Sequence, residues 1–169
     1  MITLRQLTGT PEEIKALQLI FEDSPRFSIL STGSLAANDA AAKVFTMCPK
    51  GKTYEDKLVF GVYEHERLVG CVDLIRAYPG AESAFIGLLL LSESNEGRGL
   101  GSLAFREVEK WVAPWGYRQM KLGIIETNER ARRFWSKLGF EPTGEAKPFH
   151  GAAVETRILV FAKSLPLAA

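Results

Sequence analysis

An unbroken apolar run at residues 84–91, followed by a loop rich in glycine, constrains the fold of this chain more than any other feature. A strand without polar residues has no face suited to water, so both faces of its sheet must be covered. The loop runs through Glu96-Gly97-Arg98-Gly99-Leu100-Gly101-Ser102 and leads into a helical pattern at residues 100–111. These two segments predict a sheet with helices packed against it.

The remaining strand and helix signals indicate the order of the elements. Alternating or apolar segments predict further strands at 2–7, 58–63, 68–75, 119–125 and 154–162. Helices are predicted after a capping box formed by Thr10 and Glu13, within residues 34–47, and between Asn128 and Gly139. The first of these helices is expected to stop before the Ser-Pro pair at residues 24–25.

This order predicts the fold class. The three consecutive strands at 58–63, 68–75 and 84–91 indicate an antiparallel meander, and the strand–helix–strand unit that follows them indicates a parallel pair. The predicted class is therefore α/β, with a mixed sheet and helices on both faces. Because the chain has 169 residues and shows no linker or internal repeat, we expect residues 1–169 to form a single domain.

Composition and charge exclude several classes of function. The formal net charge of +1 is too small for a nucleic-acid binder of the usual kind. Cys48, Cys71, His65 and His150 are far apart in the sequence, so they form no recognisable metal site, and we expect both cysteines to be buried. The first residues show no charged segment followed by an apolar one, and no apolar run is long enough to span a membrane. We therefore expect a cytoplasmic protein without metal, nucleic-acid partner or membrane partner.

The glycine-rich loop is suited to bind a phosphate group. Glycines allow a tight turn and a close approach of the backbone, and the unpaired N–H groups of a helix start attract an anion. A Walker loop requires Gly-Lys-Ser/Thr, which is absent, and the glycines at 97, 99 and 101 do not match the dinucleotide pattern G-x-G-x-x-G. A glycine-rich turn without a chemical role remains the alternative at this point.

A second segment, after the loop in the sequence, helps to interpret the glycine-rich loop. Residues 128–140 read Asn128-Glu-Arg-Ala131-Arg-Arg-Phe134-Trp135-Ser-Lys137-Leu138-Gly139-Phe140. The pair of segments resembles the GNAT superfamily of N-acetyltransferases, whose motifs are Gln/Arg-x-x-Gly-x-Gly/Ala at a helix start and Asn-x-x-Ala-x-x-Phe-Tyr-x-Lys-x-Gly-Phe. The motif match extends over about residues 58–142. The resemblance implies a GNAT-like acyl-CoA N-acyltransferase fold.

The resemblance also implies a donor and the residues that bind it. In this family acetyl-CoA lies in a V-shaped opening between two parallel strands, here 84–91 and 119–125. The backbone of Leu89 and Leu91 would pair with the pantetheine arm, and an N–H near Leu90 would polarise the thioester carbonyl. The amides of the loop would hold the pyrophosphate, and other family positions would lie beside the rest of the cofactor. These residues are Gly97, Arg98, Gly99, Leu100, Gly101 and Ser102 for the loop, and Asn128, Phe134 and Lys137 for the remainder. Phe134 has an alternative reading as core, and Lys137 as a solvated surface charge.

Two positions depart from the family pattern. Glu96 stands where the family has Gln or Arg, and a carboxylate beside a pyrophosphate is unfavourable unless it turns away or Arg98 offsets it. Trp135 stands where the family usually has the Tyr that protonates the departing thiolate, and an indole cannot act as an acid at neutral pH. We therefore assign no general acid, and expect water to protonate the thiolate.

An acceptor amine must lose a proton before it attacks, so a carboxylate is expected near it. Asp73, in the middle of a predicted strand, is the candidate base or ammonium partner, and the alternative is a structural acid paired with Arg76. Glu126 and His150 are weaker candidates. The predicted function is acetyl transfer from acetyl-CoA to a primary amine by direct attack in a ternary complex. The alternative is an acyl-CoA-binding module without turnover.

The acceptor itself is not identified by the sequence. In this family its site is built largely from the region around residues 22–52 and the loop around 143–154, which show the weakest patterns. Many relatives dimerise, so a homodimer remains open.

Overall fold

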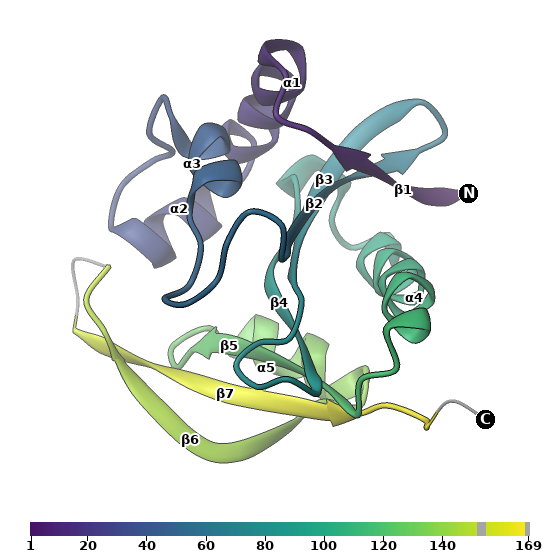
Figure 1. The fold of residues 1–169 in the computed structure, drawn as a ribbon. Coiled ribbons are helices and arrows are strands. Elements are labelled where there is room, and N and C mark those ends of the chain that lie inside the picture. Colours follow the sequence, from purple (N-terminus) through teal and green to yellow (C-terminus); the bar gives the residue numbers. More distant parts are fainter. Residues whose placement is uncertain (152–154, 168–169) are drawn as a thin grey trace.

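A single mixed sheet runs through the computed structural model, which describes residues 1–151 and 155–167 (Figure 1). The seven strands lie in the order β1-β2-β3-β4-β5-β7-β6. Their bounds are β1 (Ile2–Leu7), β2 (Lys57–Glu64), β3 (Arg67–Ile75), β4 (Ser83–Leu91), β5 (Gln119–Ile125), β6 (Glu141–Phe149) and β7 (Thr156–Ser164). The predicted antiparallel meander and the predicted parallel pair, β4 with β5, are both confirmed.

The parallel pair separates along its length. Pairing between β4 and β5 covers residues 83–86 and 119–122, and among residues 1–151 and 155–167 the rest of β4 has no strand partner on that side. β5 continues to pair with β7 on its other edge. A V-shaped opening therefore begins where the two strands diverge.

A bulge marks the same point of β4. Asp73 of β3 lies opposite Leu88, whereas the next residue, Leu74, lies opposite Ile86. Gly87 is therefore an extra residue in β4, as in a β-bulge, and bulges bend a strand and re-aim its side chains. The bulge accompanies the divergence of β4 from β5.

Helices cover both faces of the sheet. α1 (Pro11–Glu22), α2 (Pro25–Thr32) and α3 (Ala40–Thr46) lie on one side, and α4 (Leu100–Val112) lies on the other (Figure 1). α5 (Glu129–Lys137) contributes Trp135 to the core beneath α4, and two short 3-10 turns, Glu93–Asn95 and Ala113–Trp115, flank α4. A second, smaller core lies under α1 and includes Cys71 and Leu90. The layered arrangement expected from the apolar run is confirmed.

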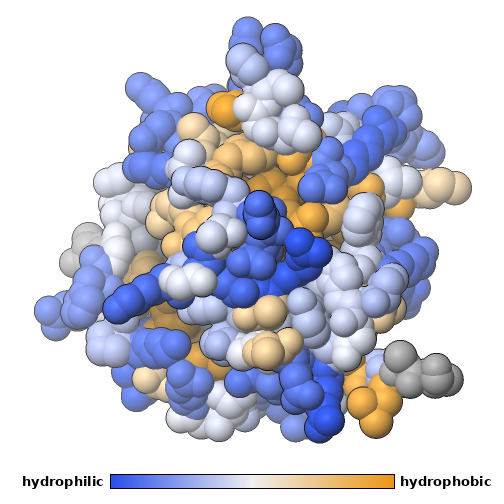
Figure 2. Space-filling model, in the orientation of Figure 1, coloured by the Kyte–Doolittle hydropathy of each residue, from blue (hydrophilic) through white to orange (hydrophobic). Residues whose placement is uncertain are grey.

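Hydrophilic residues cover most of the visible surface, and hydrophobic ones gather in its middle (Figure 2). In the described part of the chain, no helix is both long enough and apolar enough to cross a membrane.

Four segments differ from the predictions. α2 was not expected, because Pro25 reads as the end of α1, yet proline is equally suited to the first position of the next helix. The helix expected within 34–47 begins only at Ala40. β6 lies in a segment expected to be a loop: it contains Pro142 and Pro148, is exposed, and lies at the sheet edge, where proline is tolerated. The last strand begins at Thr156 rather than at Val154, which lies outside the described residues.

Candidate active site

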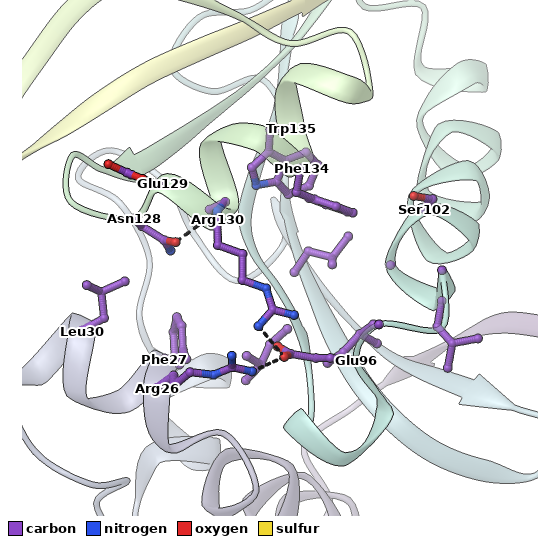
Figure 3. Close-up of a pocket in the computed structure, with 18 of the residues that line it drawn as sticks. Arg26, Phe27, Leu30, Glu96, Ser102, Asn128, Glu129, Arg130, Phe134 and Trp135 are labelled. Carbon is purple, nitrogen blue, oxygen red and sulfur yellow. Dashed lines mark hydrogen bonds and ion pairs between the residues drawn. The ribbon is translucent and has the colours of Figure 1, made fainter.

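A cavity of about 720 Å³ lies in the opening beside β4 (Figure 3). The end of β4, the glycine-rich loop, the first turns of α4 and α5, and α2 all contribute to its walls. The lining residues are Arg26, Phe27, Leu30, Leu89, Leu90, Leu91, Glu96, Gly97, Gly99, Leu100, Gly101, Ser102, Thr127, Asn128, Glu129, Arg130, Ala131, Phe134 and Trp135. The structure thus brings together most of the residues expected to bind the cofactor, with Arg98 and Lys137 as exceptions.

The loop backbone adopts conformations that require glycine. Gly97 and Gly99 have φ of 74° and 76°, a region that residues with a Cβ rarely adopt. Gly99 precedes α4 without any side-chain cap, so the first N–H groups of the helix have no partner within it. These N–H groups, together with the helix dipole, favour an anion at the end of the loop.

Close packing joins the loop to α5. A Cβ placed on Gly101 would lie 3.1 Å from the ring of Phe134, so the helix start and the aromatic side chain nearly touch. The side chain of Asn128 accepts a hydrogen bond from the Ala131 N–H at 3.0 Å and thereby caps α5. Two helix starts therefore border the same cavity.

Trp135 is a wall of the cavity and part of the core. Its ring lies 4.9 Å from that of Phe134, 5.2 Å from Phe140 and 5.7 Å from Phe105, measured between centroids. A side chain buried among three aromatic rings is fixed by packing. Lys137, by contrast, is exposed and does not line the cavity.

The charged residues of the loop differ from the expected arrangement. Glu96 points into the cavity and forms ion pairs with Arg26 and with Arg130 (Figure 3). Arg98 points away from the cavity and binds Glu64 at 2.7 Å, and this contact holds the pKa of Glu64 below its usual range. The expectation that Arg98 offsets Glu96 is wrong, because Glu64 at the end of β2 binds its guanidinium group.

Backbone direction decides which amides of β4 face the opening. The N–H of Ser92 donates to the Val69 carbonyl of β3. Since alternate residues of a strand point the same way, the N–H of Leu90 also faces β3, whereas those of Leu89 and Leu91 face the opening. The amides near Leu90 that face the opening are therefore those of Leu89 and Leu91, and the N–H of Leu90 itself points to β3.

Asp73 lies next to the bulge, beside the opening rather than among the cavity-lining residues. It is only 8% exposed, its Oδ2 binds the Lys57 ammonium at 2.5 Å, and its Oδ1 has no hydrogen-bond partner among the described residues. Burial raises the pKa of this carboxyl group, and Lys57 partly opposes the effect. The alternative pairing with Arg76 is wrong, because the guanidinium of Arg76 instead donates to the backbone carbonyl of Glu55.

The two weaker candidates for the base lie elsewhere. Glu126, at the end of β5, binds Arg157, and this contact holds the pKa of its carboxyl group below the usual range. A lowered pKa makes Glu126 a poor proton acceptor. His150 is exposed at the end of β6.

Three lining residues of α2 and α5 were missed from the sequence. Arg26 and Leu30 line the cavity from α2, and Arg130 lines it from the first turn of α5. The signal that would have located the first two is Pro25, which begins α2. Arg130 lies inside the motif at 128–140, at a position where the motif specifies no residue type.

Comparison with known proteins agrees with this geometry. A family model described as "Acetyltransferase (GNAT) family" matches residues 21–140. An uncharacterized N-acetyltransferase of Bacillus subtilis, YobR, is 28% identical over 104 residues, which is 60% of this chain and 38% of YobR. The chain thus spans less than half the length of that relative.

Solved structures share the fold over nearly the whole chain. An acetyltransferase from Thermus thermophilus is 25% identical with a TM-score of 0.71, covering 96% of this chain and 97% of that one. A GNAT family acetyltransferase from Elizabethkingia anophelis, solved with acetyl-CoA bound, is 16% identical with a TM-score of 0.66, covering 97% and 98%.

Proposed function

Because this chain belongs to the GNAT family of acetyltransferases, we propose that it transfers an acetyl group from acetyl-CoA to a primary amine. The observation that carries this proposal is the assembly of one cavity from the free edge of β4, the glycine-rich loop and the start of α5. The acceptor amine, carried by a small molecule or a protein, and a cytoplasmic location are parts of the same proposal. A homodimer stays a prediction.

The donor would bind along β4. The free backbone groups of Leu89 and Leu91 offer a strand edge to the amide groups of the pantetheine arm. The unpaired N–H groups at the start of α4 would hold the pyrophosphate, and Asn128 at the start of α5 would lie near the rest of the cofactor. The bound acetyl-CoA in the related Elizabethkingia structure supports this choice of donor.

Asp73 would prepare the acceptor for attack. An alkylammonium group has a pKa of about 10.4, so it must lose a proton to become a nucleophile. The free Oδ1 of Asp73 is buried beside the bulge, where it can bind the ammonium group and take that proton. The raised pKa of this carboxyl group makes it a better proton acceptor than an exposed aspartate.

Backbone donors would stabilise the transition state. The N–H of Leu89 faces the opening and would donate to the oxygen that gains negative charge when the amine attacks the thioester carbon. The carbon–sulfur bond then breaks and the sulfur leaves as a thiolate. Since a thiol of this kind has a pKa of about 8.5, it needs little acid assistance, and water would protonate it in the absence of a tyrosine at position 135.

A non-catalytic acyl-CoA-binding module is the second candidate. Two observations favour it: Trp135 supplies no acid group, and Glu96 places a carboxylate inside the cavity. Such a module would bind acetyl-CoA without releasing CoA.

Release of free CoA thiol from acetyl-CoA distinguishes the two candidates. The reaction is followed with a panel of primary amines, including alkylamines, amino acids and peptides. The panel is run with a Cys48→Ser background, because Cys48 is half-buried, contrary to the expectation of burial, and would react with the thiol reagent. Cys71 is buried, and burial raises the pKa of its thiol, so it should not react with the thiol reagent. Amine-dependent release supports the enzyme; binding without release across the panel supports the module.

A further inference from the structure

Glu96 bridges two arginines that belong to opposite walls of the cavity. Its Oε2 binds Arg26 of α2 and lies 2.8 Å from Nη1 of Arg130 in α5. Figure 3 shows the side chain of Arg130 extending from α5 across the cavity to the carboxylate. Both guanidinium groups therefore converge on one anion beside the glycine-rich loop.

Further contacts hold Arg26 in this position. Its backbone N–H donates to Oε1 of Glu93 at 2.8 Å, and its Nε lies 3.2 Å from the same oxygen. The N–H of Glu93 in turn donates to the carbonyl of Asp23 at 2.7 Å. The start of α2 is thus attached to the segment that leads into the loop, and Arg26 would stay in place if Glu96 moved.

Glu96 is held in the cavity by its two ion pairs and not by apolar packing. Its side chain is 26% exposed and lies outside the apolar cores. It directly precedes Gly97, whose φ of 74° places it in a backbone region that glycine leaves and re-enters at little cost. Rotation of this side chain out of the cavity therefore disturbs no core packing.

We propose that Arg26 and Arg130 form a phosphate subsite for the donor, and that Glu96 occupies this subsite in the free protein and leaves it when the donor binds. The inference rests on the proposed function, since it assigns the phosphates of acetyl-CoA to these two side chains. Guanidinium groups bind carboxylate and phosphate oxygens with the same fork geometry, so the carboxylate stands in for a phosphate.

Charge favours this exchange. Arg26 pairs with Glu93 and Glu96, and Arg130 pairs with Glu96, so the charges of the two guanidinium groups are compensated while Glu96 stays inside. Departure of Glu96 would leave Arg130 without this carboxylate and Arg26 with Glu93 alone. A pyrophosphate brought next to a retained Glu96 would meet like charge, which is costly in a partly desolvated site.

The chain offers matched variants for a test. Glu96→Gln removes the competing charge and keeps the shape of the side chain. Glu64→Gln is the control, because Glu64 binds Arg98 of the same loop outside the cavity. Arg130→Gln removes half of the subsite. Dissociation constants are measured by calorimetry for CoA, for inorganic pyrophosphate and for pantetheine, which carries no phosphate.

Glu96→Gln is expected to bind CoA and pyrophosphate about tenfold more tightly than the wild type, with pantetheine unchanged. Glu64→Gln is expected to match the wild type, and Arg130→Gln to bind both phosphate probes more weakly. Equal or weaker binding of CoA by Glu96→Gln would overturn the subsite while leaving the proposed function intact. Tighter pyrophosphate binding by Glu96→Gln without any CoA binding would support the subsite and contradict acetyl-CoA as donor. If neither probe binds either protein, both proposals fail.

Discussion

The carboxylate of Asp73 lies directly over the backbone of Gly87: a Cβ placed on Gly87 would lie 2.7 Å from Oδ2. Gly87 is the extra residue of the β4 bulge and is exposed, whereas Asp73 is buried on the neighbouring strand. The bulge thus brings an exposed backbone and a buried acid together at the point where β4 leaves β5. This contact links the fold directly to the proposed chemistry.

Two substitutions should therefore lower turnover through the same carboxylate. Asp73→Asn removes the proton acceptor, and Gly87→Ala pushes the carboxylate aside. We expect kcat to fall at least about 100-fold in the first and about tenfold in the second, with the Kd for acetyl-CoA unchanged. Glu126→Gln is the control, since the carboxylate of Glu126 is bound by Arg157. A Glu126→Gln defect larger than that of Asp73→Asn would assign the base to Glu126.

Stability should depend on pH through Asp73. Burial raises the pKa of this group in the folded protein above its value in the unfolded chain, so the folded state binds more protons between the two values. The contribution of this proton to the free energy of unfolding is fully present below the pKa that Asp73 has in the unfolded chain. It is lost as pH rises through the pKa that Asp73 has in the folded protein. Melting temperatures of Asp73→Asn and the wild type should therefore agree at low pH, and the variant should become the more stable one as pH rises. A gap that narrows with rising pH would contradict this assignment.

Substitutions at Asn128 should separate its role as the cap of α5 from its proposed role in binding the cofactor. Asp caps a helix as well as Asn does, so Asn128→Asp should keep the melting temperature, whereas Asn128→Ala should cost about 1 kcal/mol. The new carboxylate would repel the phosphates of the donor, so the Kd of Asn128→Asp for acetyl-CoA should rise about tenfold. Calorimetry measures both variants; unchanged affinity in Asn128→Asp would remove this residue from the donor site.

Trp135 should act through packing and not as an acid. We expect Trp135→Phe to lose about 1–3 kcal/mol of stability, with kcat changed less than about tenfold. Loss of a true general acid would cost about 100-fold or more. Trp111→Phe is the matched control, because Trp111 is half-exposed and packs on Phe60, away from the cavity. A larger fall in kcat would show that the indole takes part in the chemistry.

Much of the fold was predictable because its elements carry strong local signals. The capping box of Thr10 and Glu13 and the cap at Asn128 are present as expected. β6 carries no such signal: it contains Pro142, Gly144 and Pro148, is little buried, and is held in the sheet by pairing with β7. The formation of such a strand is determined by pairing within the sheet and not by the local sequence of the strand.

The sequence predicted the part of the site that is formed by the backbone of the glycine-rich loop. It did not predict the ion pairs between side chains. Gly97 and Gly99 indicate a phosphate-binding loop, since few other functions require positive φ at two nearby positions. The contacts of Asp73 with Lys57, and of Glu96 with Arg26 and Arg130, depend on strand register and helix placement. Residues 16 to 70 positions apart in the sequence give no local sign of such pairing.

Binding of acetyl-CoA to the cavity can be measured most directly from melting temperatures with and without the donor. At a hundredfold excess over Kd, binding adds about 2.7 kcal/mol, and the wild type should melt about 5–10 °C higher. Gly99→Val should abolish the rise, because valine cannot easily adopt φ of 76°. Gly116→Val, at φ of 70° and outside the cavity, should lose similar stability and keep the rise. The absence of any rise in the wild type at millimolar acetyl-CoA would contradict acetyl-CoA as the donor.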